Sequence, residues 1–196
     1  MRKGIIELVR MIASVSGLSE LAMTTNGVLL RDSAQDLKNA GLQRVNISLD
    51  AIDPANYTRI TRGGDVKQVF KGIEAAEKVG LTPIKLNCVV TGSAPGEDGI
   101  AVKRYGEERG FQVRFIHQMD LAKGTFSVVE GGNGGNCAAC NRLRLTSNGY
   151  IKPCLFNDAG FSVRNLGPEE ALRQAIENKP KKGTYNLSEK FYSIGG

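Results

Sequence analysis

The hydrophobic positions of this chain follow two periods, one typical of helices and one typical of strands. Apolar residues recur every three to four positions in segments that we predict to be helices with one buried face. These segments are residues 4–16, 33–40, 66–79, 97–109 and 168–178, with a further helix beginning at Asp53-Pro54. Shorter apolar-rich runs predict strands at residues 21–26, 44–50, 82–90 and 111–118. Strands alternating with helices at this spacing predict an α/β fold with a parallel sheet.

Helix start signals refine two of these boundaries. Asp53 followed by Pro54 combines a capping carboxylate with a proline in the first helical turn. Asp32 or Ser33 is expected to cap the helix at residues 33–40 through its side-chain oxygen.

Three successive strands carry polar residues on one face and apolar residues on the other. The polar positions are Thr24, Asn26, Asn46, Ser48, Asp50, Lys85 and Asn87. A parallel sheet covered by helices on both sides would be apolar on both faces. We therefore predict an incomplete (partial) TIM-type barrel of parallel strands with a polar, ligand-holding interior. The alternative is an amphipathic sheet with one face in solvent. Cys88 lies on the apolar face and is expected to be a packed thiol.

The pattern changes after residue 119, which divides the chain into residues 1–119 and residues 120–196. A glycine-rich stretch at residues 131–135 leads to a predicted hairpin with arms at residues 143–146 and 150–153. Its turn is Ser147-Asn148-Gly149, whose residue types favour a tight connection.

Cys137, Cys140 and Cys154 are the clearest signal of chemistry in the chain. Cys137-Ala-Ala-Cys140 places two thiolates on one turn, and Cys154 comes from the far arm of the hairpin. Zinc sites and electron-transfer iron–sulfur clusters usually take four protein ligands. Three ligands leave one metal position open, where a substrate binds.

Arg142 and Arg144 alternate on the strand between the second and third cysteines, so both guanidinium groups are expected to point the same way. Two such groups beside a metal would bind an anion, above all phosphate. As an alternative, both arginines are simply exposed on the strand.

Composition narrows the choice of partners. The chain has 196 residues and a net charge of +6, but only 6% aromatic residues. Its basic residues form no single stripe, and the run Lys179-Pro-Lys-Lys182 is expected at the solvated surface, so nucleic acid is disfavoured. No apolar run approaches the ~20 residues of a membrane span. Four cysteines, two of them as CxxC, suit metal or redox chemistry in a reducing cytoplasm.

The cysteine–arginine block resembles a known family. Cys137-x2-Cys140-Asn-Arg-Leu-Arg-Leu-Thr…Cys154-Leu-Phe is similar to the carboxyl-terminal cluster motif of the GTP 3′,8-cyclase family (molybdenum cofactor biosynthesis protein A), a radical S-adenosylmethionine (SAM) family. The resemblance extends over nearly the whole chain. Its other segments are Thr24-Thr-Asn-Gly27, Arg44-Val-Asn-Ile-Ser-Leu-Asp50, Ile60-Thr-Arg62, Ile84-Lys-Leu-Asn87, Arg114-Phe-Ile…Met119 and Gly195-Gly196.

The resemblance assigns expected roles residue by residue. It implies that Cys137, Cys140 and Cys154 hold an auxiliary [4Fe–4S] cluster whose open iron contacts the guanine of GTP. The expected GTP contacts are Thr24, Lys85, Arg142, Leu143 and Arg144. The expected SAM contacts are Ser48 and Met119. The terminal Gly195 and Gly196 are expected to thread into the active site.

The resemblance also implies an activity. Family members convert GTP to 3′,8-cyclo-7,8-dihydro-GTP in molybdenum cofactor biosynthesis. A 5′-deoxyadenosyl radical made from SAM removes hydrogen from the ribose 3′ carbon, which then closes onto guanine C8. The expected protein is cytoplasmic, binds neither membrane nor nucleic acid, and is a possible homodimer, since family members are often dimers.

One departure from the family concerns the radical itself. The family's first cluster uses CxxxCxxC, followed by a Gly-Gly-Glu-Pro strand that binds SAM, and this sequence has neither. We expect a truncated chain that supplies the substrate-binding portion and does not generate the radical alone. The second [4Fe–4S] cluster is expected only in a full-length form.

Two rival functions remain at this point. One is another radical SAM enzyme with the same auxiliary-cluster layout, acting on a peptide or metabolite. The other is a zinc-ribbon module that uses Cys137, Cys140, Cys154 and His117 as ligands and binds nucleic acid through its basic surface.

Overall fold

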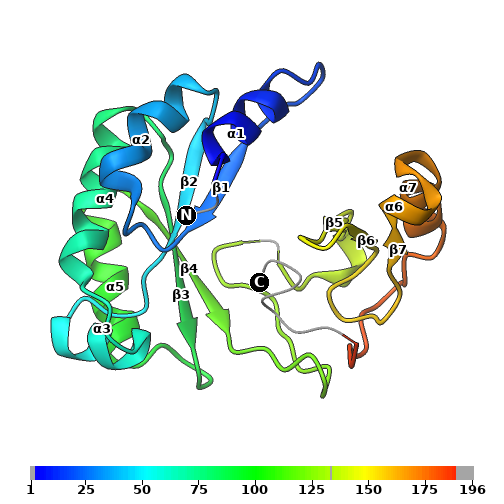
Figure 1. The fold of residues 1–196 in the computed structure, drawn as a ribbon. Helices are drawn as coiled ribbons and strands as arrows, with labels where there is room; N and C mark the ends of the chain where they lie inside the picture. Colours follow the sequence, from blue (N-terminus) through cyan, green and yellow to red (C-terminus); the bar gives the residue numbers. More distant parts are fainter. Residues whose placement is uncertain (1–2, 133, 189–196) are drawn as a thin grey trace. The chain divides into compact units, whose positions relative to one another are not determined.

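The computed structural model describes residues 3–132 and 134–188 (Figure 1). Its Cα positions separate the chain into two compact units, Met1–His117 and Gln118–Gly196.

The first unit is built on a parallel sheet of four strands in the order β1-β2-β3-β4. The strands are β1 (Ala22–Thr25), β2 (Arg44–Ser48), β3 (Lys85–Val90) and β4 (Gln112–His117). Every neighbouring pair is parallel. This confirms the predicted α/β fold of parallel strands.

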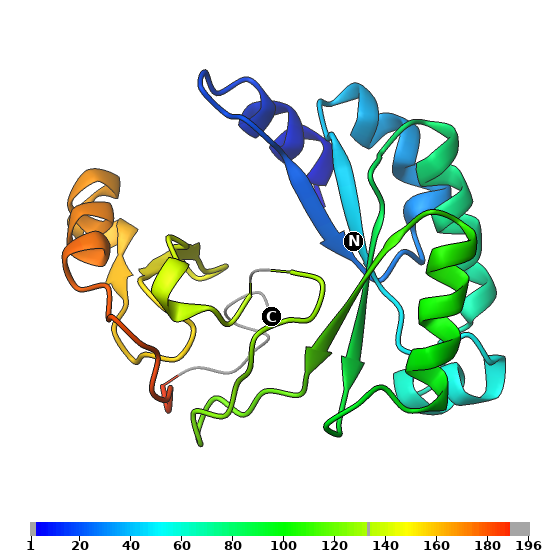
Figure 2. The same ribbon diagram turned by 180° about the vertical axis from the view of Figure 1, so that it is seen from behind.

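Helices cover one face of this sheet, and the two opposite views agree on the side (Figures 1 and 2). The helices of the unit are α1 (Ile5–Ala13), α2 (Leu30–Asn39), α3 (Pro54–Thr61), α4 (Val66–Lys78) and α5 (Glu97–Glu108). Between sheet and helices lies one apolar core that includes the completely buried Val45, Ile47, Leu49 and Leu86. All four side chains come from the strand positions that the sequence pattern marks as apolar. The polar positions therefore lie on the face opposite the helix layer.

Capping explains where two helices begin. The Asp53 carboxylate accepts a hydrogen bond from the Asn56 backbone N at 2.9 Å, with Pro54 in the first turn of α3, as predicted. The Asp65 carboxylate accepts one from the Lys67 backbone N at 2.9 Å at the start of α4. In each case a side chain satisfies a backbone N–H that has no partner within the helix.

The predicted start of α2 is wrong. The helix begins at Leu30, preceded by Leu29 with no side-chain cap, whereas the sequence suggested a cap at Asp32 or Ser33. Leu30 is 1% exposed and belongs to the core, so burial begins one turn earlier than the polar residues indicate. The Leu30 N–H donates to the Gly27 carbonyl at 3.1 Å, so the backbone satisfies one of the free N–H groups at the helix start.

The backbone of α4 packs closely against the turn that precedes α2. A Cβ atom at Gly72 would lie 2.1 Å from the Gly27 carbonyl oxygen. Only glycine allows the helix to lie this near the turn that follows β1.

The second unit contains a small antiparallel sheet and short helices. Its strands are β5 (Arg144–Leu145), β6 (Tyr150–Lys152) and β7 (Phe161–Ser162), and its helices are η1 (Cys137–Ala139), α6 (Val163–Leu166) and α7 (Pro168–Glu177). The predicted hairpin and its turn are confirmed, with Gly149 N donating to the Thr146 carbonyl at 3.0 Å. The pattern of apolar residues did not reveal β7 or α6, because both are too short to establish a period.

No helix within the described residues is long and apolar enough to cross a membrane.

Candidate functional site

Strand register orders the polar face of the first unit's sheet. Thr24 lies opposite Asn46, and Asn46 lies opposite Lys85. In the next row along the strands, Ser48 lies opposite Asn87. Side chains two positions apart on a strand share a face, so both rows point to the same side of the sheet. The structure thus brings three predicted site residues together: Thr24, Ser48 and Lys85.

A relay of hydrogen bonds holds Thr24. The Arg44 guanidinium donates to both carboxylate oxygens of Glu20, at 2.7 and 2.6 Å, and to Asn46 Oδ1 at 2.8 Å. Asn46 Nδ2 in turn donates to Thr24 Oγ1 at 3.2 Å. Because Thr24 Oγ1 accepts here, its own O–H is left to donate to a ligand. Sequence reasoning missed this relay, although the shared parity of positions 44 and 46 pointed to it.

Charge on this face favours an anion. The pKa of Lys85 is lowered first by burial and then by the positive charges of Arg114 and Arg44, while Glu20 acts in the opposite direction. Lys85 thus lies near Arg114 and near Arg44, and the Glu20 carboxylate already pairs with Arg44. A ligand with negative charge would relieve the repulsion between Lys85 and these arginines.

An unsatisfied amide lies on the same face. Asn87 Oδ1 is buried and makes no hydrogen bond to any described residue. Buried polar atoms in native proteins are usually paired, so this oxygen is a candidate acceptor for a ligand donor.

Two neighbouring residues serve the fold instead. Asp50, predicted on the polar face, accepts a hydrogen bond from the Val89 backbone N at 2.7 Å, and burial raises the pKa of its carboxyl. Cys88 is 1% exposed, and burial raises the pKa of its thiol to about 12. The prediction of a packed thiol at Cys88 is confirmed.

The second unit holds the three remaining cysteines as free, half-buried thiols. The η1 turn closes with Cys140 N donating to the Cys137 carbonyl at 3.2 Å. Pairing of Arg144 with Lys152 aligns the two hairpin arms. The chain stretches that carry Cys140 and Cys154 continue these arms in opposite directions along the chain.

A lysine bridges those two stretches. Lys179 Nζ donates to the Arg142 carbonyl at 2.7 Å and to the Pro153 carbonyl at 2.8 Å. It also lies 3.9 Å from Cys140 Sγ. Lys179 was expected at the solvated surface. That expectation is wrong, because the side chain is half-buried and its ammonium group donates to these protein acceptors.

Two guanidinium groups share the neighbourhood of the thiols. Burial lowers the pKa of Arg144, the charge of Arg142 lowers it further, and Cys154 and Cys140 act in the opposite direction. Arg144 is half-buried in β5, whereas Arg142 precedes the strand and is exposed. Leu143 packs against a small apolar cluster of this unit.

These residues match a metal group in their chemistry but not in their grouping. Among the residues that the structure describes, no three His, Cys, Asp or Glu side chains lie in a group that could hold a metal ion. The structure therefore does not gather Cys137, Cys140 and Cys154 into a finished ligand set. Their chemistry nevertheless fits an iron–sulfur cluster, since thiolates are its usual ligands and neighbouring cations balance its charge. His117, the fourth ligand of the zinc alternative, instead has Nδ1 3.0 Å from the Gly92 carbonyl.

Two other predicted positions have different outcomes. Met119 packs against an apolar cluster that also includes Cys154 and Phe156. Gly195 and Gly196 lie outside the described residues, so their predicted role stays a prediction.

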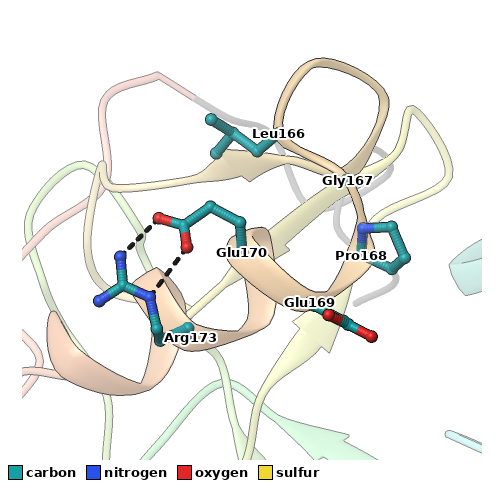
Figure 3. A pocket seen from close by; sticks show the side chains of 6 residues that line it. All are labelled: Leu166, Gly167, Pro168, Glu169, Glu170 and Arg173. Atoms are coloured by element: carbon teal, nitrogen blue, oxygen red, sulfur yellow. Dashed lines mark hydrogen bonds and ion pairs between the residues drawn. The ribbon is translucent and has the colours of Figure 1, made fainter.

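A depression of about 480 Å³ lies at the start of α7, lined by Leu166, Gly167, Pro168, Glu169, Glu170 and Arg173 (Figure 3). Arg173 donates to both carboxylate oxygens of Glu170, at 2.8 and 2.6 Å. Glu170 thus neutralises Arg173, the one basic residue that lines the depression. No predicted site residue lines this depression. This depression is therefore no candidate for the site that the sequence predicts.

Comparison with known proteins identifies the family. The model of the radical SAM superfamily matches residues 1–99, and the Molybdenum Cofactor Synthesis C model matches residues 101–187. The GTP 3′,8-cyclase of Alkaliphilus oremlandii is 35% identical, with 92% of this chain and 72% of the relative aligned. That of Peptoclostridium acidaminophilum is 34% identical, with 100% of this chain and 76% of the relative aligned.

This chain belongs to the GTP 3′,8-cyclase family. As a member, it is an enzyme of the radical SAM cyclase type with a role in molybdenum cofactor biosynthesis. Family membership implies [4Fe–4S] clusters and SAM, and it does not favour the zinc-ribbon alternative. The parallel sheet of the first unit is accordingly part of a TIM-type radical SAM fold.

Two further comparisons describe how this GTP 3′,8-cyclase family member relates to other proteins. The alignment with the Alkaliphilus oremlandii protein extends over 230 positions, more than the 196 residues of this chain, so the relative carries inserted residues. Among solved structures, the radical SAM enzyme coproporphyrinogen III oxidase (HemN) from Escherichia coli has a TM-score of 0.43 and 13% identity. That comparison covers 58% of this chain and 26% of the other.

Proposed function

We propose that this chain binds GTP for conversion to 3′,8-cyclo-7,8-dihydro-GTP. The observation that carries the proposal is that Arg144 lies near Arg142 and near the thiols of Cys140 and Cys154 in the second unit. Guanidinium groups form paired hydrogen bonds to the phosphate oxygens of a nucleotide. Thiolates are the usual ligands of an iron–sulfur cluster, which would contact the base of that nucleotide.

The polar face of the first unit would supply further substrate contacts. Lys85, among like charges, gains from a phosphate that neutralises it. Thr24, held by Asn46, presents its O–H in a fixed direction. Fixing these donors before the substrate arrives lowers the entropy cost of reaching the reactive arrangement.

The cofactors implied by the family find candidate residues in the chain. We assign Cys137, Cys140 and Cys154 as ligands of an auxiliary [4Fe–4S] cluster, and Ser48 and Met119 as contacts to SAM. When bound, SAM and its cluster supply the radical that starts the reaction. The side chains of this protein bind the substrate, orient it and balance its charge.

Nucleotide binding by an arginine variant tests the proposal. The chain, reconstituted anaerobically with iron and sulfide, should bind GTP in calorimetry, and Arg142→Ala should weaken that binding. Loss of a charged hydrogen bond costs about 1.5–3 kcal/mol, which corresponds to roughly 10–150-fold. Arg31→Ala is the matched control, because Arg31 is exposed on α2 and pairs with Asp32.

The outcome against the proposal is equally definite. If Arg142→Ala binds GTP as tightly as the parent, or if the reconstituted parent binds no GTP, the substrate assignment is wrong.

A further inference from the structure

Lys179 joins the two chain stretches that carry Cys140 and Cys154. It follows the carboxyl end of α7 and lies half-buried. One of its carbonyl acceptors, at Arg142, is two residues after Cys140. The other, at Pro153, is the residue before Cys154. A single ammonium group therefore fixes the spacing between the backbone segments of both cysteines.

The donor count of this ammonium group agrees with the geometry. A lysine has three N–H donors. Two point to the carbonyls at 2.7 and 2.8 Å, and the third faces Cys140 Sγ at 3.9 Å. Strand pairing of β5 with β6 reaches only from Arg144 and Lys152 toward the turn. Lys179 supplies a cross-link just beyond the point where the strand hydrogen bonds end.

The residues after Lys179 continue along the same hairpin arm. Thr184 N donates to the Phe156 carbonyl at 2.9 Å, and Asn186 Nδ2 donates to the Leu155 carbonyl at 2.9 Å. A Cβ atom at Gly183 would lie 3.3 Å from Cys154 Sγ. We call residues 179–186 the clasp, because this segment closes over the arm that contains Cys154.

We propose that Lys179 is a positioning residue for the auxiliary cluster, a role that rests on the cluster assignment above. Its hydrogen bonds hold the Cys140 and Cys154 segments at a fixed separation before iron arrives. Its charge beside Cys140 Sγ opposes the negative charge of a thiolate-bound cluster. Outer contacts of this kind orient ligands and tune the metal group that they bind. Net charge and hydrogen bonds near the sulfurs also set the reduction potential of a cluster.

Cluster retention and potential together test the proposal on the full chain. Lys179→Met keeps the length of the side chain and removes the donors and the charge. We expect its cluster to be lost to a ferrous chelator about tenfold faster than that of the parent. The cluster that remains should have a more negative reduction potential, because the reduced form loses a neighbouring cation. A purely structural role would leave this potential unchanged.

Two further variants serve as controls. Lys182→Met removes an exposed lysine of the same run and should retain parental chelator resistance and potential. Lys179→Arg keeps donors and charge and should restore most of both properties. If Lys179→Met does not fold, judged by circular dichroism, Lys179→Gln replaces it, since glutamine keeps a donor but not the charge.

The possible results separate the two assignments. Parental chelator resistance and potential in Lys179→Met, or in Lys179→Gln where it replaces that variant, would overturn the role of Lys179 alone. Equal effects of Lys182→Met and Lys179→Met would overturn it as well. A parent chain that takes up no iron and sulfide would overturn the cluster assignment and the role of Lys179 with it.

Discussion

The two units of this protein hold their candidate functional side chains by different physical means. In the first unit, Thr24, Ser48 and Lys85 stand on adjacent strands whose register is backed by a large apolar core. In the second unit, Cys137 belongs to η1, Cys140 precedes the very short strand β5 and Cys154 follows the short strand β6. The apolar clusters there are small.

In the second unit, hydrogen bonds from side chains to the backbone hold the chain segments in place. In the first unit, packing of the apolar core does this. Lys179, Asn186 and Asp158 each bind backbone groups of segments distant in sequence. Such contacts contribute about 1 kcal/mol each, less than a well-packed core side chain. Core packing alone therefore supports the sheet face, whereas the cysteine region is supported by a few hydrogen bonds and would be stabilised further by the proposed cluster.

The largest effect on stability is expected from a substitution in the core of the first unit. Gly72→Ala places a methyl group 2.1 Å from the Gly27 carbonyl oxygen. Alanine favours a helix by about 1 kcal/mol over glycine, but the overpacking cost exceeds that gain. We expect a net loss of about 3 kcal/mol, measured by hydrogen exchange in peptides of the first unit.

Gly92→Ala is the control for this substitution. Its methyl group meets nothing closer than 3.7 Å, so stability should change by less than about 1 kcal/mol. An equal loss in both variants would mean that the packing of α4 against Gly27 does not decide stability.

The second largest effect should come from the clasp. Asn186 is 1% exposed, and Asn186→Ala removes the donor to the Leu155 carbonyl. Leaving that buried acceptor unpaired costs about 2 kcal/mol. Exchange should accelerate in peptides of the second unit and stay unchanged in those of the first. The exposed Asn178, which donates to the Gln174 carbonyl, gives the control Asn178→Ala, with a change of about 0.5 kcal/mol or less.

A smaller effect, on GTP affinity, is expected from a substitution on the polar face of the sheet. Asn46→Ala removes the hydrogen bond to Thr24 Oγ1 and frees one Arg44 donor. We expect GTP affinity to fall about fivefold, the equivalent of about 1 kcal/mol for one hydrogen bond. Asn39→Ala on α2 is the control, since it lies at the helix end. Unchanged affinity in Asn46→Ala would show that the relay does not serve the ligand.

The smallest expected effect is a difference between the two units in how their stability depends on pH. In the second unit, hydrogen bonds from Arg173 and Gln174 lower the pKa of Glu170 from 4.5 to about 2. Its stabilising contribution is therefore present above pH 4.5 and is lost as pH falls toward about 2. In the first unit, burial raises the pKa of Asp50, so its contribution is larger in acid and declines as pH rises through that pKa.

Carboxyl chemical shifts measured by NMR check this directly. Glu170 should still be ionised at a pH where Asp50 is already protonated. The Glu170→Gln variant should lose the acid-dependent part of the second unit's stability. Titration of both groups at the same pH would contradict the assignment.

Much of the first unit follows from sequence periodicity. Alternation at Asn46, Ile47 and Ser48 predicted which side chains enter the core, because successive residues of a strand point to opposite faces. The start of α2 was mispredicted, because burial of Leu30 outweighs the polar residues that follow it. Local signals fail where a distant core decides the boundary.

The candidate site divides in the same way. Cys137, Cys140, Cys154, Arg142 and Arg144 are close in sequence, so their spacing alone pointed to an anion-binding metal region. Lys179 is 39 residues from Cys140 and stands in a run of charges that looks like ordinary surface. Nothing in its local pattern marks it as a partner of the hairpin.

Sequence alone was enough to predict the family, the parity of the strands and three candidate thiol ligands, because each of these depends on residues near one another in the chain. Only the tertiary structure decided the register that aligns Thr24, Asn46 and Lys85, and the contacts of Lys179 with both hairpin arms. Those depend on how distant segments pack, and packing depends on the whole chain at once.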